Sequence, residues 1–448
     1  MDRSEQAQFK RCMEYYCADP DFRSLMDSDP GKAVASIGLE QLNARSALQA
    51  IRGIVFHKGD SEALRDNPYV RASAEHEKRA ADYLAGFRRP TGRASDKVLR
   101  FERNTLERCR IESSLIRRNS HVMFVPFAFE LSKGCSVQCP FCGFAAERHR
   151  ADFLYSEENA ALFRKIILLA NEYAGGTAAH CPLYFATEPF DNPDYEKFML
   201  DFREITGAFP QTTTAVAERF PGRMRRWMEQ VGSEDILEHA ALRFSIRTLS
   251  QFRKIAAIYS PEELLGVELL PNNPESVLLC SASGRAAEGK ACTVSRNAMR
   301  YSICCVAGMK VNLVDRTVEF IEPELPDDRY PLGYSVRERR GFSGAEEFAG
   351  ILRDFDRRYV HDSMPRSLPL RFNHSADFSA EGDEWRFTGD GCGYRIGKNI
   401  FTTAVVEGIK AHRSFTDNLA LFSLTAENVQ KLYEAFNELY VRGYIRSE

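Results

Sequence analysis

The sequence predicts an α/β protein whose central part is a barrel of parallel strands. Between residues 121 and 325, short apolar runs alternate with stretches of helical periodicity, a pattern that implies a parallel sheet. Right-handed crossovers curl such a series into a barrel with its chemistry at the C-terminal ends of the strands. The length of 448 residues leaves room for one or two smaller domains, because single cores stop growing beyond about 250 to 300 residues.

Helices are predicted ahead of this barrel. Residues 1–60 have helical spacing, with helix starts at Asp19-Pro20 and Asp29-Pro30, and we predict a helical region there. Residues 61–120 are predicted to form a basic helical linker, broken at Arg89-Pro90. The strongly basic stretch from Arg88 to Arg118 is interpreted as a solvated helix face, with a binding stripe for an acidic peptide or nucleic acid as the alternative.

Each element of the barrel region, residues 121–325, has its own signal. The apolar run from Val122 to Leu131 predicts the first strand, and Ser156 is placed to cap a helix that ends at Gly175-Gly176. Further strands are predicted at 181–187, 211–217, 242–247 and 266–270, and helices at 193–205 and 249–259. A hairpin is expected at 311–321, around Asp315-Arg316, before a proline-rich end of the barrel.

A C-terminal domain is predicted over residues 326–448. We expect it to complete the active site at the end of the barrel. It contains the glycine-rich stretch from Gly389 to Gly393, which surrounds Cys392. An apolar stripe predicts a terminal helix, with Gly443 as its C-terminal cap. The stripe consists of Val429, Leu432, Tyr433, Phe436, Leu439 and Tyr440.

The charge balance and hydropathy exclude several classes of partner. With 60 Lys and Arg against 63 Asp and Glu, the formal charge of -3 argues against a DNA-binding groove. From the polar N-terminus we expect no signal peptide, and no apolar run approaches the roughly 18 residues that cross a bilayer. We therefore expect a cytoplasmic protein without a membrane partner, in which the 12 cysteines stay reduced and available to iron.

Three cysteines follow the first predicted strand with the spacing C-x3-C-x2-C: Cys135, Cys139 and Cys142. A zinc site closed by protein usually has four ligands, whereas three cysteines leave one iron of a four-iron cluster without a protein ligand. An open iron can bind a substrate. The alternatives are three buried free cysteines or a zinc-binding adaptor with His149 as the fourth ligand.

This spacing, with an aromatic residue before the last cysteine, resembles the signature of the radical S-adenosylmethionine (SAM) superfamily. The resemblance implies a partial (β/α)6, TIM-like barrel and one [4Fe-4S] cluster held by the three cysteines. It also implies SAM as a cofactor on the fourth iron and an electron donor such as flavodoxin or ferredoxin. Reductive cleavage of SAM would give a 5'-deoxyadenosyl radical, with Phe141 covering one side of the site.

The resemblance also implies SAM-binding residues. Relatives usually have Gly-Gly-Glu after the second strand, where this chain has Ala186-Thr187-Glu188. Glu188, helped by Thr187, would bind the methionyl ammonium, although a carboxylate that starts a helix is the alternative.

Two later strands carry similar candidates. Ser245 and Arg247 resemble the polar pair that holds the ribose and the methionyl carboxylate, and the arginine fork suits a carboxylate. Leu270 and Asn272 lie in a loose match to the segment along the adenine, which is equally typical of an ordinary strand end.

Further features resemble the radical SAM amino-acid epimerases that mature ribosomal peptides of the proteusin type. The stretch 18–39 is similar to helical leader peptides related to nitrile hydratase, and this implies a ribosomal precursor peptide with a helical leader as partner. In such enzymes the radical removes the alpha hydrogen of an L-residue, and a cysteine thiol returns a hydrogen to the opposite face. Cys392 is the candidate donor, because Gly391 and Gly393 let a substrate backbone approach. Cys304 and Cys305 are alternative candidates for the donor, and a purely structural role for Cys392 is also open.

A different radical SAM chemistry is the runner-up. An enzyme that forms a thioether or carbon-carbon crosslink would bind an auxiliary cluster through some of the late cysteines. These are Cys280, Cys292, Cys304, Cys305 and Cys392. No C-x2-C pair follows Cys142, and there is no separate cobalamin-binding domain, so one cluster and one thiol are the simpler interpretation.

Overall fold

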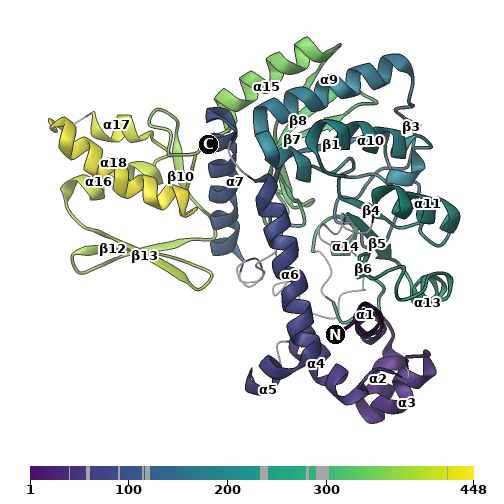
Figure 1. The fold of residues 1–448 in the computed structure, drawn as a ribbon. Coiled ribbons are helices and arrows are strands. Elements are labelled where there is room, and N and C mark those ends of the chain that lie inside the picture. Colours follow the sequence, from purple (N-terminus) through teal and green to yellow (C-terminus); the bar gives the residue numbers. More distant parts are fainter. Residues whose placement is uncertain are drawn as a thin grey trace.

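A computed structural model describes residues 1–39, 41–56, 61–88, 91–113, 116, 122–232, 241–278, 282–288, 302–420 and 422–447. Within these ranges the protein is a mixed α/β molecule with several small sheets, none of which closes into a barrel. Among the described helices, none is both long and apolar enough to cross a membrane. Figure 1 shows the N-terminal helices below the main sheets and the C-terminal elements to one side.

The N-terminal helices enclose a hydrophobic core of their own. They are α1 (Arg3–Ala18), α2 (Pro20–Ser28), α3 (Pro30–Ser36), α4 (Ala44–Phe56), α5 (Ser61–Asp66) and α6 (Pro68–Phe87). The predicted starts at Asp19 and Asp29 are confirmed, because each carboxylate accepts hydrogen bonds from the first turn of the helix that follows. Arg11 ties this core to the main unit by donating to the carbonyls of Ala256 and Tyr259, both at 2.9 Å.

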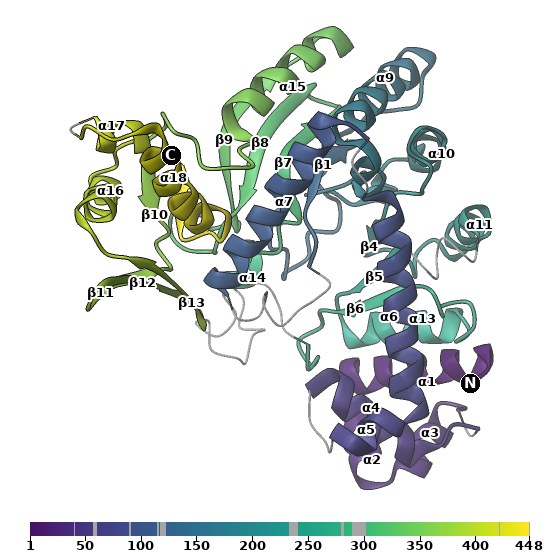
Figure 2. The same ribbon diagram turned by 60° about the vertical axis from the view of Figure 1, so that its left-hand side comes forward.

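Helix α7 (Arg93–Glu112) lies between the main sheets and the C-terminal elements (Figure 2). Its Phe101 packs into the main core and its Ile111 into the C-terminal core. Arg108 is buried between Glu112 and Glu324. The interpretation of this basic stretch as a solvated face is therefore wrong for Arg108, because neighbouring carboxylates neutralise it inside the protein. Arg89, Pro90 and most of residues 114–121 lie outside the described residues.

Two sheets form the main unit. The first has the order β1-β7-β8-β9, with β1 parallel to β7 and the other pairs antiparallel. Its strands are β1 (Val125–Glu130), β7 (Val306–Asn312), β8 (Thr317–Pro323) and β9 (Tyr334–Gly341), and β7 and β8 form the predicted hairpin. The second sheet is parallel and consists of β4 (Thr212–Thr214), β5 (Leu242–Ile246) and β6 (Glu268–Pro271). A small ribbon pairs β2 (Ser132–Lys133) with β3 (Ala151–Asp152).

Helices connect and cover these strands. They are α9 (Glu157–Ala174), α10 (Tyr195–Thr206), α11 (Pro221–Val231), α13 (Leu249–Ile258), α14 (Gly284–Glu288) and α15 (Ala345–Tyr359), with 3-10 turns η1 (Gly175–His180) and η2 (Pro189–Asp191). The predicted cap is confirmed, since the Ser156 hydroxyl accepts from the backbone N–H of Asn159 and the helix ends at Gly175. The parallel strands and intervening helices confirm the α/β class of the main unit.

Residues 181–187 do not form the predicted strand, so this prediction is wrong. The two sheets of the main unit separate at this segment. The backbone N–H of Phe129 in β1 donates to the Pro182 carbonyl at 2.9 Å, but no regular ladder forms along this segment. Pro182 has no N–H to donate to a neighbouring strand. Tyr184 reaches the other sheet through its hydroxyl, 2.6 Å from the Thr213 hydroxyl.

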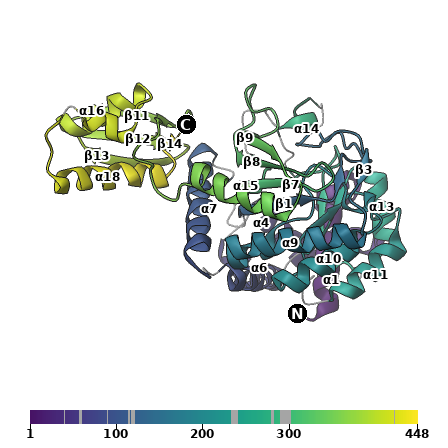
Figure 3. The ribbon, with the colours of Figure 1, turned by 90° about the horizontal axis from the view of Figure 1, so that it is seen from above.

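The C-terminal unit, residues 364–420 and 422–447, has a second hydrophobic core. It contains β10 (Leu370–Phe372) paired with β14 (Ile445–Ser447), and a meander of β11 (Asp377–Glu381), β12 (Glu384–Gly389) and β13 (Cys392–Gly397). Helices α16 (Ile400–Lys410), α17 (Phe415–Leu419) and α18 (Ala426–Val441) cover these strands. The predicted apolar stripe of α18 is confirmed, and Gly443 follows it with φ +85°. Seen from above, this unit stands apart from the main sheets (Figure 3).

Candidate functional site

The three motif cysteines lie on the loop between β2 and β3, which its own hydrogen bonds close. The backbone N–H of Cys135 donates to Glu147 O at 2.9 Å, and that of His149 donates to Cys135 O at 3.3 Å. Gln138 has a left-handed φ of 51°, and its side-chain amide donates to three loop carbonyls, including Cys135 O at 2.8 Å. The sequence therefore builds a fixed backbone for the three thiols.

Helix α14 and η2 hold this loop from outside. The Arg285 guanidinium donates to Cys139 O at 3.0 Å, and the Arg285 backbone N–H donates to Cys142 O at 2.9 Å. A Cβ on Gly284 would lie 2.6 Å from Cys142 O, so only glycine allows α14 this close. On the other side, the Asp191 carboxylate accepts from the Ser136 backbone at 2.8 Å and from its hydroxyl at 2.5 Å.

The central thiol of the motif, Cys139, is influenced by residues of other elements. Its pKa is raised to about 12, chiefly by burial and then by Cys135, Cys142 and Glu188, while Arg247 acts to lower it. The three cysteines are each partly accessible. Glu188 and Arg247, the residues predicted to bind the SAM amino-acid group, are therefore neighbours of the cysteine loop.

The motif thiols are not gathered as a preformed site for a single metal ion. Among the described residues, no group of three or more His, Cys, Asp and Glu side chains is arranged to hold one ion. His149, the suggested fourth zinc ligand, instead pairs with Asp152 at 3.0 Å. A four-iron cluster differs in this respect, because each cysteine binds a different iron and the thiols need not converge.

Glu188 is buried beside these cysteines, with an exposed fraction of 3%. Its carboxylate accepts from the Thr214 hydroxyl at 2.6 Å, the Ala215 backbone N–H at 2.9 Å and the Phe190 backbone N–H at 3.2 Å. Burial raises its pKa to about 7, although these donors act to lower it. The last bond caps η2, so Glu188 is a turn-start carboxylate as well as a neighbour of the cysteines. A carboxylate offers about four acceptor positions, which leaves one for an ammonium.

Arg247 has an unused donor. Its Nη2 pairs with Glu218 at 3.2 Å, and its buried Nε has no hydrogen-bond partner within the described part of the chain. A buried unpaired N–H is costly, and a ligand carboxylate would satisfy it. The donor set therefore fits the amino-acid end of SAM.

The remaining predicted SAM residues lie on the adjoining strands. The Asn272 side-chain amide donates to the Ser245 hydroxyl at 3.2 Å, and Leu270 is the register partner of Ser245 across β5 and β6. Thr187 is half-buried next to Glu188. Ser245, Leu270 and Asn272 thus lie side by side on the adjoining strands, and their role in binding SAM stays a prediction.

Phe144 makes the aromatic contact at this end of the strands. Its ring stacks on Phe185 with centroids 4.1 Å apart, and Tyr334 meets both rings edge-on. Phe141, the predicted cover, is half-exposed. Phe144 is two positions beyond Cys142 and could have been found from the motif, whereas Arg285 and Glu218 have no local signal.

The candidate donor Cys392 belongs to a different core from the motif cysteines. It begins β13 after a turn and packs against the C-terminal core. The pKa of the nearby Tyr444 is raised by burial first and by Cys392 second. The neighbouring Asp390 N–H donates to Ile111 O at the end of α7, at 2.7 Å. Cys392 is therefore not grouped with the Cys135 loop.

The other late cysteines are scattered. Cys304 is buried in the main core, whereas Cys305 at the start of β7 is exposed. Cys280 and Cys292 lie outside the described residues.

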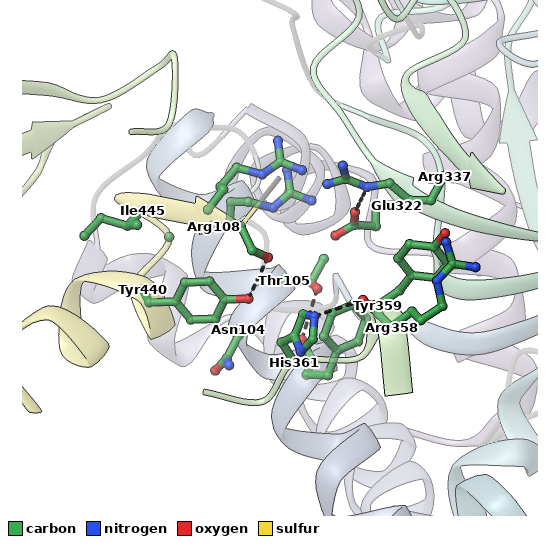
Figure 4. A pocket seen from close by; sticks show the side chains of 14 residues that line it. Asn104, Thr105, Arg108, Glu322, Arg337, Arg358, Tyr359, His361, Tyr440 and Ile445 are labelled. Atoms are coloured by element: carbon green, nitrogen blue, oxygen red, sulfur yellow. Dashed lines mark hydrogen bonds and ion pairs between the residues drawn. The ribbon is translucent and has the colours of Figure 1, made fainter. Parts of the chain in front are cut away.

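A cavity lies where α7, β8, β9 and β14 meet, and it is lined by several arginines, some of which Figure 4 labels. The lining arginines are Arg108, Arg337, Arg358 and Arg446. Each pairs with a carboxylate: Arg108 with Glu112, Arg337 with Glu322, Arg358 with Glu338, and Arg446 with Glu324. Because the positive charges are neutralised, this cavity is a structural junction rather than an anion site.

Comparison with known proteins leaves the activity open. No protein-family model and no solved structure matches the chain. The uncharacterized protein y4wI of Sinorhizobium fredii (strain NBRC 101917 / NGR234) is 30% identical over 336 residues. The match covers 72% of this chain but only 63% of the relative, less than two thirds of its length. This chain is thus similar to a longer protein whose function is itself uncharacterized.

Proposed function

We propose that this protein is a radical SAM enzyme that converts L-residues of a ribosomally made precursor peptide to D-residues. The observation that carries the proposal is the fixed C-x3-C-x2-C loop with Glu188 and Arg247 acting on its central thiol. This is the donor set that the superfamily resemblance implies.

A partial (β/α)6 barrel belongs to the same proposal. The β1 strand and the parallel sheet β4-β5-β6 are bridged by residues 181–187, through the Phe129 bond to Pro182 and the Tyr184 bond to Thr213. The Cys135 loop follows β1, and Arg247 follows β5, so both lie at C-terminal strand ends. That is the end where barrel enzymes carry their chemistry.

The three thiols would hold one [4Fe-4S] cluster and leave an iron for SAM. The bound pair supplies a carbon-centred radical that removes a hydrogen atom from the peptide. In this chain, Glu188 has an acceptor position for the methionyl ammonium, and Arg247 Nε has a proton for the carboxylate. The stacked rings of Phe144 and Phe185 exclude water beside the loop.

Cys392 remains the proposed hydrogen donor. Its S–H bond would break as a C–H bond forms on the opposite face of the alpha carbon. The sulfur radical left behind then takes up one electron from a donor such as flavodoxin or ferredoxin and a proton from water. Because both groups act on one alpha carbon, the thiol and the Cys135 loop would have to lie on either side of the same peptide residue, so the C-terminal unit, where Cys392 packs, would have to approach the loop when the peptide binds.

Anaerobic purification followed by iron analysis tests the cluster. We expect visible absorption, about four irons per chain and reductive cleavage of SAM to 5'-deoxyadenosine. The Cys139→Ala variant should lose all three, whereas Cys12→Ala, in the N-terminal core, should keep them. About eight irons would favour the crosslinking alternative with an auxiliary cluster, and a colourless zinc protein would reject the radical chemistry.

Coexpression with a leader-bearing peptide, followed by chiral amino-acid analysis, tests the epimerisation. In heavy water each inverted residue should gain one deuterium at the alpha carbon, because the thiol proton exchanges with solvent. Cys392→Ala should still cleave SAM but release no D-residues. Normal epimerisation by this variant would reassign the donor.

A further inference from the structure

A basic groove lies between the loop that follows β8 and the C-terminal unit. It is lined by Arg329, Arg371, Phe372, Phe378, Ile409, Lys410 and His412, and its empty volume is about 780 Å³, including the part open to solvent. Unlike the arginines of the cavity in Figure 4, its Arg329 and Arg371 have no ion pair within the part of the chain that the structure describes.

Arg371 is placed at an energetic cost. It lies directly opposite Arg446 across the antiparallel pair β10–β14, so both side chains share one face. Arg446 is neutralised by Glu324, with two contacts of 2.7 Å, but Arg371 has no ion pair or side-chain hydrogen bond in the described ranges. Burial, together with the charge of Arg446, lowers the pKa of Arg371, although the more distant Glu324 acts to raise it. An anionic ligand would relieve both effects.

Arg329 is the second available cation of the groove. It is exposed, and among the described residues its guanidinium contacts only the Tyr330 ring, 5.2 Å from the centroid. Lys410 also faces the aromatic floor, 5.2 Å from the Phe378 ring, although Glu407 pairs with it. The stacked rings of Phe372 and Phe378, 4.2 Å apart, give this floor an apolar surface.

The groove is connected to the cysteine loop by short contacts. Pro331, two residues after Arg329, accepts through its carbonyl from the Gly284 backbone N–H at 2.8 Å. Gly284 begins α14, which holds Cys139 and Cys142 through Arg285. The loop that carries Arg329 is therefore in direct contact with the helix that holds the cysteine loop.

We propose that this groove binds a segment of the precursor peptide that carries acidic side chains, with Arg329 and Arg371 as their partners. The inference rests on the proposed function for the peptide as substrate. Carboxylates match the paired donors of an arginine fork, and the aromatic floor suits the carbon stems of a peptide. A nucleic acid would need a longer row of cations, because it carries a charge at every phosphate, and the chain's formal charge is -3.

Fluorescence anisotropy with a labelled glutamate-rich peptide containing one phenylalanine tests this proposal. The matched probe has glutamine in place of every glutamate. We expect the glutamate peptide to bind more tightly, and Arg371→Gln and Arg329→Gln each to weaken it about tenfold, as the loss of one charge-assisted contact predicts. Arg71→Gln, at an exposed position of α6 in the N-terminal region, should bind like the wild type.

Three results would overturn the proposal. They are equal affinity for the two peptides, wild-type affinity in both groove variants, and equally strong competition by a single-stranded DNA oligonucleotide. Removing Arg371 relieves a like-charge contact, so this variant should fold, and Arg329→Gln on an exposed loop is an independent check. The assay contains no SAM, so its result does not depend on the proposed radical chemistry. That chemistry is tested separately by the iron content and the SAM cleavage of the wild-type protein.

Discussion

Glu102 shows how strongly burial acts on a single residue of this protein. It lies on α7 with an ion pair to Arg88, and one carboxylate oxygen is buried without a hydrogen-bond partner in the described residues. Burial raises its pKa from 4.5 to about 7, and the opposing charge of Arg88 only limits this rise. The carboxyl group is thus easier to protonate in the folded protein than in the unfolded chain.

This shift predicts the pH dependence of stability. Because folding raises the pKa of Glu102, its protonated carboxyl stabilises the folded protein below about pH 4.5. This contribution to the free energy of unfolding is lost as the pH rises through about 7. Relative to Glu102→Gln, the wild type should lose roughly 3 kcal/mol of unfolding free energy across that window. Urea unfolding of both proteins from about pH 4.5 to about pH 8 measures the difference.

A control for this prediction is Glu107→Gln on the same helix, where the carboxylate is 40% exposed. Its difference from the wild type should change little with pH, because solvent screens an exposed pair. If the unfolding free energies of the wild type and Glu102→Gln change with pH in the same way, the predicted effect of the buried Glu102 carboxyl is wrong.

At the scale of elements, α14 is held against the cysteine loop by a glycine contact. Gly284 has φ +54°, and an added Cβ would lie 2.5 Å from Gly143 O and 2.6 Å from Cys142 O. Gly284→Ala should therefore push α14 away from the loop, at a cost of about 1 to 3 kcal/mol. We expect weaker urea resistance of the metal-free protein and faster loss of iron from the reconstituted one.

Gly350→Ala is the matched substitution. Gly350 lies inside α15, has open space where a Cβ would go, and should gain about 0.5 to 1 kcal/mol, because alanine favours helices. If Gly284→Ala and Gly350→Ala have the same urea resistance and lose iron at the same rate, the close contact between α14 and the cysteine loop does not require glycine.

The elements that could be predicted from the sequence are those with local causes. Asp19, Asp29 and Ser156 cap their helices as expected, because capping depends on a few neighbouring residues. The strand at 181–187 could not be predicted correctly, because strand formation depends on a distant partner and Pro182 lacks a donor. Glu188 and Arg247 both act on the pKa of Cys139, and their role in binding SAM stays a prediction. Arg285 could not be foreseen, because its contact spans 146 residues.

At the scale of the whole molecule, buried charges join the C-terminal unit to the main sheets. Glu324, just after β8, accepts two bonds of 2.7 Å from Arg446 of β14, and Arg108 of α7 lies 3.5 Å away. These arginines lower the pKa of Glu324 to about 2, although burial alone would raise it. The proposed peptide groove depends on this junction, because its walls come from both sides.

Glu324→Ala should therefore loosen the C-terminal unit. Removing one partner of a buried pair leaves Arg446 and Arg108 short of negative charge, and such losses cost about 3 to 5 kcal/mol. We expect a lower unfolding free energy and limited proteolysis in the loop after β8, with the main unit still protected. The double variant Glu324→Ala/Arg446→Met should recover part of the stability, because no unpaired charge remains at Arg446. If the double variant is no better than the single one, packing rather than charge holds the two units together.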